Sequence, residues 1–445
     1  MMNRLCGNSD SLQCMRRVRV GAVLLWIALG VSACTSFKPV PLNNLDYMQR
    51  ANMQQRDGLK ITVSVLTREE TRKAFGKKLD KRLIQPVWIE IENNTDRDYW
   101  LLLHALDPDY FSAREAAYVS HGLDTASNKG IDEFFDELGI NRFANAGQTT
   151  SGFVFSNLKL GTKEVRIRLF AEKEIQEFEF YVTVPGLRAD WQRVDFESIY
   201  AQEEWIEIDE YGELRAQLEK FMCCTTKKNG TNSGDPINLV VIGAPRELQS
   251  FIKAGWDETE IISAGSSWRT FKAFVTGSEY KYSPISALYI FQRPQDIGLQ
   301  KARDTINERN HLRLWLSPIQ FRGEDVWIGA ISRDIGVFLT TRAWNLTSHA
   351  IDPEVDEARD YLIEDLAMAQ ALAEVGTVSG VGEVTREEPK KNLLGSPWWT
   401  DGERAVLWLS ETPVPLEELE LADWGDSVNY RLRRPQDPSA SGDRR

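Results

Sequence analysis

A basic segment followed by an uncharged apolar run opens this chain and limits how much of it can fold as a globular body. Three arginines between positions 16 and 19 precede Val20 to Ala33, 14 residues without a charged side chain. As a helix this run rises about 21 Å, short of the roughly 30 Å hydrocarbon core of a bilayer. A basic region, a short apolar run and small residues at its end are the parts of an export signal. We therefore expect residues 1–33 to be a signal peptide that is removed.

The residue after this run is Cys34, and Val31-Ser32-Ala33 stands directly before it. This junction resembles the lipobox of bacterial lipoproteins, in which the cysteine becomes the acylated first residue of the mature chain. The resemblance implies that Cys34 carries a lipid anchor in the bilayer and that the body faces the periplasm of the cell envelope. Thr35 in place of aspartate implies the outer membrane. An ordinary cleaved signal with an unrelated cysteine is the alternative.

Composition limits the class of protein and its partners. Removing the signal leaves 412 of 445 residues, enough for two or three domains. The full chain has a net charge of −13 and the signal carries +3, so the mature chain is at −16. Such an acidic chain repels nucleic acid, and we expect no nucleic-acid partner. With 42% apolar and 27% charged residues, it has the composition of a globular protein.

Two further cysteines remain in the mature chain, the neighbours Cys223 and Cys224. Consecutive Cα atoms lie about 3.8 Å apart, below the roughly 4.4–6.8 Å that is usual for a disulfide. We expect a bridge between them to be strained and easily reduced, so cross-linking does not hold this fold together. Cys223 as a nucleophile would need a neighbouring base, which the sequence does not place.

The first half of the mature chain alternates apolar and polar residues, the pattern of half-buried strands. The predicted strands are residues 59–66, 85–93, 152–155, 164–170 and 177–184. Helices interrupt them after Ser112, which has the capping-box spacing with Glu115, and at 131–138. We predict an α+β protein in which residues 58–186 form an immunoglobulin-like β-sandwich with a helical insertion, after a tether at 34–57. Another small β-rich α+β domain is the alternative.

The second half of the chain mixes helix-like and strand-like sequence patterns. A connecting segment at 187–234 holds a predicted helix at 211–222 and a loop from Cys223 onward. A mixed α/β domain is predicted over 235–426, followed by a disordered tail at 427–445. Its predicted elements are strands at 237–243, 287–291, 311–318, 325–333 and 404–411, and helices at 245–254 and 353–375. Asp352 is the predicted N-cap of the last helix, with Pro353 in its first turn.

Two stretches of this domain carry candidate functional residues. Strand alternation puts His311, Arg313 and Trp315 on one face. In the second stretch, Asp352, Asp356 and Asp360 are four residues apart and share one face of the predicted helix. Like charges on one face repel, so we expect a cation nearby.

That cation is Arg359, Arg313, a protonated histidine or a divalent metal. One interpretation is a single site, with metal ligands from His311, His349, Asp352 and Asp356, or an acid–base pair supported by Arg313 and Arg359. The other is a solvated helix face whose acids complement the helix dipole, with His349 as a local cap and His311 as a packed strand residue.

Several motifs of the second half occur in a definite order. They are Asp235 to Gly243, Ala254-Gly-Trp256, Ser283-Pro-Ile-Ser286, Arg309 to Trp315, Val326-Trp-Ile-Gly329 and His349 to Asp360. In this order they resemble the LssY-like C-terminal domain family over residues 235–380. Members of that family occur in bacterial envelope proteins, some beside membrane phosphatase-like or DedA-like segments. The family often has a glutamate before the arginine, where this chain has Ala358, which weakens a catalytic role for that stretch.

The resemblance names a domain but no reaction. We therefore expect a cell-envelope lipoprotein with a binding or assembly role, and a lipid bilayer and an envelope protein as its partners. The alternative is a periplasmic hydrolase that acts on a phosphate or lipid-derived substrate through a His/Asp/Arg site.

Overall fold

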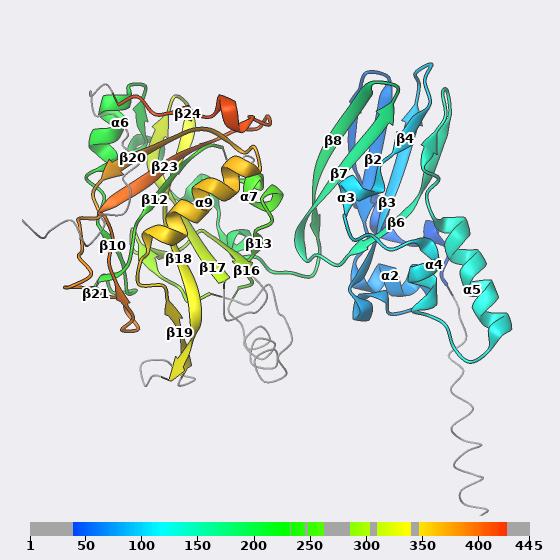
Figure 1. Cartoon of the computed structure of the whole chain (residues 1–445), viewed down its shortest axis with the longest axis horizontal. Coiled ribbons are helices and arrows are strands. Elements are labelled where there is room, and N and C mark those ends of the chain that lie inside the picture. The colour runs from blue at the N-terminus through cyan, green and yellow to red at the C-terminus, as the bar shows by residue number, and fades with distance from the viewer. Residues whose placement is uncertain are drawn as a thin grey trace, which may run out of the picture. The chain divides into compact units, whose positions relative to one another are not determined.

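The computed structural model describes residues 39–231, 233–244, 248–261, 285–302, 309–339 and 347–424, with the backbone alone for 337–339 and 347–349. The predicted signal peptide at 1–33, Cys34 and the predicted tail at 427–445 lie outside the described residues. The chain divides into two compact units, Met1–Leu158 with Arg166–Phe178, and Lys159–Val165 with Glu179–Arg445 (Figure 1). None of the helices described is long and apolar enough to cross a membrane.

Two four-stranded sheets lie mainly in the first unit, and parts of β7 and β8 belong to the second. One has the order β1-β2-β3-β6, from β1 (Asn52–Arg56), β2 (Leu59–Val65), β3 (Ile84–Asn93) and β6 (Thr149–Asn157). The other has the order β5-β4-β7-β8, from β4 (Tyr99–Leu101), β5 (Phe143–Ala144), β7 (Gly161–Ala171) and β8 (Glu174–Val184). The strands predicted from alternation are all present, mostly a few residues longer. The protein is a β-rich α+β structure.

Helices join these strands. They are α2 (Arg68–Phe75), α3 (Leu103–Leu106), α4 (Ala113–Tyr118) and α5 (Thr125–Leu138). The capping box at α4 is confirmed, since Ser112 accepts from the Glu115 amide and Glu115 from the Ser112 amide. Part of the predicted tether is ordered, because β1 pairs antiparallel with β2 and Tyr47 is buried. Short 3-10 helices η1 (Leu42–Asn44) and η2 (Asp46–Arg50) precede β1 in the chain.

A ten-stranded mixed sheet is the centre of the second unit. Along the sheet its strands are β13 (Asp257–Glu258), β16 (Ile297–Ala302), β17 (Arg309–Phe321), β18 (Glu324–Leu339), β12 (Leu239–Ile242), β23 (Glu403–Leu409), β20 (Leu372–Ser379) and β24 (Glu420–Leu421). In addition, β9 (Ile206–Ile208) pairs with β17 and β19 (Thr347–Ile351) with β18. The pairing is antiparallel through β13, β16, β17, β18 and β12, and parallel between β12 and β23.

The two faces of this sheet carry separate cores. On one face, Leu312 and Leu314 of β17 pack with Leu362 of α9 (Asp356–Met368) and with residues of α7 (Gln249–Lys253). On the other face, Trp315 and Ile328 pack with α6 (Tyr211–Leu218). A four-stranded sheet in the order β11-β10-β14-β15 contributes to that second core. Its strands are β10 (Cys224–Thr226), β11 (Ser233–Pro236), β14 (Tyr289–Ile290) and β15 (Arg293–Pro294).

The prediction of one long helix over residues 353–375 is wrong at both ends. α9 starts at Asp356, its N-cap is Val355 without a side-chain cap, and Asp352 instead accepts from the Glu354 amide in the preceding turn. After Met368 the chain turns through Gln370, whose φ is 58°, and then enters β20 beside β23. Pairing with a distant strand overrides the helical pattern there. The loop predicted from Cys223 onward likewise contains β10 and the start of β11.

Candidate functional site

Three basic side chains follow one face of β17. Arg309, His311 and Arg313 are 4%, 7% and 6% exposed. We call these three residues the basic row. They alternate with Leu312 and Leu314, which belong to the core on the α9 side, so the basic row faces away from α9, as alternation predicts. The sheet therefore buries a row of basic groups where a strand interior usually carries apolar ones.

The neighbouring strands supply polar partners for this row. Gln300 of β16 and Ser332 of β18 both pair with His311. Asp334 Oδ2 lies 3.6 Å from His311 Nδ1 and 3.8 Å from Arg309 Nε. These are ion-pair distances, longer than a good hydrogen bond. One buried carboxylate thus stands between two basic groups.

The two arginines donate to neutral oxygens. Arg309 Nη1 is 2.7 Å from Gln300 Oε1, and Arg313 Nε and Nη2 are 3.3 and 3.2 Å from the Ser286 carbonyl oxygen. Burial lowers the pKa of both arginines, and nearby carboxylates, Asp334 among them, only partly offset this. Each guanidinium is therefore desolvated without a direct carboxylate hydrogen bond in the described part of the chain.

Two further carboxylates, of Asp235 and Asp190, act on Arg313 through space. Burial raises the pKa of Asp235 and of Asp190, and the charge of Arg313 partly counters each shift. Gly298, which pairs with Arg313, makes room for one of them, because a Cβ on this glycine would lie 2.8 Å from Asp190 Oδ2. Gln295 Nε2 donates to that same oxygen at 3.2 Å. The row is thus flanked by acids that bond to neutral donors.

The acidic start of α9 forms a separate and closed network. Arg359 binds both oxygens of Asp401 at 2.9 and 3.0 Å and contacts Asp356 and Asp360 at 3.3 and 3.0 Å. Asp356 also accepts from the Thr400 hydroxyl and the Asp401 amide, both at 2.7 Å. Hydrogen bonds and these carboxylates outweigh burial and raise the pKa of Arg359. This network ties the first turn of α9 to the start of β23.

Of the predicted site residues, the structure brings Asp356 and Arg359 together but separates both from His311. His311 faces one side of the central sheet, whereas α9 with Asp356 and Arg359 packs on the other. His349 lies in β19, where its backbone pairs with Val337. The structure describes the backbone of His349 but not its side chain. Within the described ranges, no group of three or more His, Cys, Asp or Glu side chains could hold a metal ion. Asp352 belongs to the turn before α9.

Asp334 is the site residue that the sequence did not indicate. It is placed by the β17–β18 hairpin, whose two turn residues Arg322 and Gly323 both have positive φ, 52° and 81°. Gly323 between two strand patterns was the readable part of this turn. The register shifts between Leu316 and Gln320, and no local pattern announces this irregularity. As a result Ser332 pairs with His311, and Asp334 lies diagonally across from His311 on the same face.

Comparison with known families identifies this domain. Residues 215–403 match the family described as LssY C-terminus. This part of the chain is therefore an LssY C-terminal domain, and it contains both the basic row and the α9 network. The match is somewhat longer than the resemblance over residues 235–380. No curated protein and no solved structure matches the chain.

Proposed function

We propose that the protein is a lipoprotein of the bacterial cell envelope whose LssY C-terminal domain binds an anionic, phosphate-bearing ligand at the basic row of β17. The anchor is acylated Cys34, and the body faces the periplasm from the outer membrane. In this proposal the first unit is an immunoglobulin-like sandwich, built from its two four-stranded sheets. The observation that carries the binding role is the pair of buried guanidinium groups at Arg309 and Arg313.

A comparison with other arginines of the same domain supports this role. Arg359 donates two hydrogen bonds to Asp401, and Arg293 donates two hydrogen bonds of 3.0 Å to Asp296. A buried charge is stable when it is paired and its donors are used. In the described part of the chain, Arg309 and Arg313 instead donate to one neutral oxygen each. Each guanidinium has five N–H donors, so most remain for a ligand.

Phosphate suits these donors. Guanidinium groups bind phosphate oxygens through paired, charge-assisted hydrogen bonds. Arg309 and Arg313 are four residues apart on a strand, about 13 Å of chain, with His311 between them. Their long side chains can converge on one anion over His311. A phosphomonoester, free or as a lipid headgroup, has the oxygen acceptors that Arg309 and Arg313 can bind directly.

The test is binding of inorganic phosphate, and of phosphatidylcholine vesicles that contain phosphatidic acid, measured by calorimetry and vesicle sedimentation. We expect binding to the wild-type protein and at least tenfold weaker binding for Arg309→Gln and Arg313→Gln, since tenfold corresponds to about 1.4 kcal/mol, one charge-assisted bond. Arg386→Gln is the matched control, because Arg386 is exposed and contacts the ring of Trp399.

Each outcome has a definite meaning. Binding of phosphate alone identifies a soluble ligand, and binding of the vesicles alone identifies a lipid headgroup. Arg313→Lys keeps the charge and serves if Arg313→Gln does not fold. If wild-type protein binds neither probe, or if the two glutamine variants bind as well as Arg386→Gln, the basic row is a structural feature and the proposal is wrong.

The second candidate function is hydrolysis of a phosphate or lipid-derived ester, favoured by the contact between His311 and Asp334. A carboxylate beside Nδ1 orients an imidazole for proton transfer at Nε2. The test is release of p-nitrophenol from p-nitrophenyl phosphate by wild-type protein, His311→Asn and Asp334→Asn. Turnover that depends on both residues supports a hydrolase. Phosphate binding without turnover leaves the binding role.

A further inference from the structure

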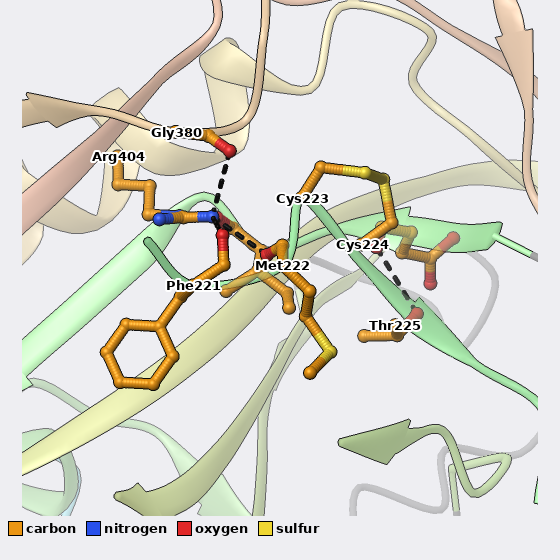
Figure 2. Close-up of a disulfide and its surroundings, with 9 residues drawn as sticks. Phe221, Met222, Cys223, Cys224, Thr225, Gly380 and Arg404 are labelled. Carbon is orange, nitrogen blue, oxygen red and sulfur yellow. Dashed lines mark hydrogen bonds between the residues drawn. A yellow bond between two sulfur atoms is a disulfide. The ribbon is translucent and has the colours of Figure 1, made fainter. Parts of the chain in front are cut away.

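The neighbours Cys223 and Cys224 form a disulfide with each other, with Cα atoms 3.8 Å apart (Figure 2). A disulfide stabilises a fold mainly by closing a loop and so reducing the freedom of the unfolded chain. This one joins consecutive residues and closes no loop of intervening chain. It therefore contributes little to the free energy of unfolding, and a role other than cross-linking has to account for it.

Arg404 fixes the backbone directly before this pair. Its side chain is buried, and Nη2 donates to the carbonyl oxygens of Phe221 and Met222 at 2.9 and 2.8 Å, and to that of Gly380 at 3.1 Å (Figure 2). Its other nitrogens donate to the carbonyl oxygens of α6 and the segment before β12. Burial lowers the pKa of Arg404 to about 10, so it stays charged at neutral pH.

The backbone after the pair is fixed as well. The Ile237 amide donates to the Cys223 carbonyl oxygen at 2.8 Å, and Cys224 pairs with Pro236 in the β10–β11 ladder. None of these hydrogen bonds uses the sulfur atoms. The frame around the cysteines therefore remains when the sulfur–sulfur bond is broken, and it keeps the two thiols next to each other.

The two sulfurs differ in their surroundings. Cys224 is 3% exposed and packs in an apolar cluster with Ile351, Val355 and Trp398. Cys223 lies at the edge of this cluster and is partly exposed. An external thiolate must approach the sulfur–sulfur axis at the more accessible sulfur, so Cys223 is the atom attacked and Cys224 carries the leaving sulfur.

We propose that Cys223–Cys224 is a reversible thiol–disulfide exchange site that takes a dithiol as its reaction partner. A thiolate of the dithiol attacks Cys223 Sγ, the sulfur–sulfur bond breaks, and Cys224 Sγ leaves with the electron pair and takes up a proton. The second thiol of the partner then attacks the mixed disulfide and releases Cys223 as a thiol. In sum, the partner loses two electrons and two protons, and the two cysteines gain them.

The test uses detergent-solubilised full-length protein, titrated with dithiothreitol without denaturant, trapped with N-ethylmaleimide and mapped by peptide mass. We expect no label on Cys223 or Cys224 before reduction, one label on each after it, and loss of both sites again after reoxidation. Circular dichroism should stay unchanged throughout. The reduced protein should also bind phenylarsine oxide, which needs two neighbouring thiols, and the Cys224→Ser variant should not.

Several results would overturn the proposal. Labels before any reductant would mean that the cysteines are not bridged. Labels that appear only in denaturant would mean that no partner reaches the bond in the folded protein. Loss of the folded spectrum on reduction would mean that the bridge is a structural link. Arg404→Lys tests the frame, and we expect it to slow reoxidation relative to wild type while reduction still occurs.

Discussion

Asp334 lies on the strand next to His311, and its carboxylate is 3.6 Å from the Nδ1 atom of that histidine. The same carboxylate is 3.8 Å from Arg309 Nε. Among the described residues, Asp334 is thus an acid within ion-pair distance of two members of the row on β17, and it is 3% exposed. Its charge favours the burial of these two basic groups.

Asp334→Asn should destabilise the second unit, because it leaves Arg309 buried beside a neutral group. Breaking a buried ion pair from one side costs about 3–5 kcal/mol. If the row binds phosphate, added phosphate should raise the melting temperature of this variant more than that of the wild type, since the anion replaces the lost charge. Thermal unfolding with and without phosphate measures both effects. Equal shifts for the two proteins would contradict a ligand at this row.

Gly298→Ala should disturb the same site from the opposite strand. A Cβ there would lie 2.3 Å from Thr259 Oγ1 and 2.8 Å from Asp190 Oδ2, so these buried groups must shift. Overpacking of this kind costs about 1–3 kcal/mol. Gly336→Ala in β18 is the matched control, because nothing lies within 4 Å of a Cβ at that position. Chemical unfolding of both variants should show a loss for Gly298→Ala alone.

The Arg359 network should matter for stability and not for ligand binding. Asp401→Asn removes the two-bond partner of Arg359. The side chain of Arg359 is 7% exposed but that of Asp401 is 40% exposed, so solvent screens the pair and we expect a loss of about 1–2 kcal/mol in the free energy of unfolding. Asp360→Asn is the control, since Asp360 is 59% exposed and an exposed pair contributes about 1 kcal/mol or less. Phosphate affinity should be the same in folded Asp401→Asn as in the wild type. A selective loss of affinity would assign the network to the site.

Tyr211 should make the protein lose stability at alkaline pH. Burial, followed by its hydrogen bond to Glu374, raises the pKa of Tyr211 from 10 to about 12. Between these pH values the folded state keeps a proton that the unfolded state releases, so the free energy of unfolding falls as pH rises through this window. Urea unfolding at several pH values should show a shallower decline for Tyr211→Phe. An identical decline would mean that other groups govern this range.

The proposed lipid anchor at Cys34 can be tested directly. Cys34→Ser should abolish incorporation of labelled palmitate in bacterial cells, because the proposal attaches the acyl chains at that cysteine. The variant should then appear as a soluble protein or an uncleaved precursor on fractionation. Cys223→Ser serves as the control and should label like the wild type. Palmitate incorporation into Cys34→Ser at the wild-type level would rule out the lipoprotein assignment.

Local pattern was enough for much of the fold. Alternation located the long strands of the first half, and the spacing of Ser112 and Glu115 located the start of α4, because these signals depend on neighbours in sequence. The local apolar pattern predicted the wrong element at residues 372–379, which continue the apolar stripe of α9 but form β20. Their hydrogen-bond partner, β23, is some thirty residues away, and the sequence gives no local sign of it.

The candidate site shows the same division. Alternation alone determined that His311 and Arg313 share a face of one strand, because successive side chains of a strand point to opposite sides. Only the tertiary structure decided that this face is opposite to α9, which separates His311 from Asp356, and that Ser332 pairs with His311 while Asp334 lies diagonally across from it. Such choices depend on which surfaces pack together and on how strands pair over long distances. Those contacts are set by the whole chain and not by any short stretch of it.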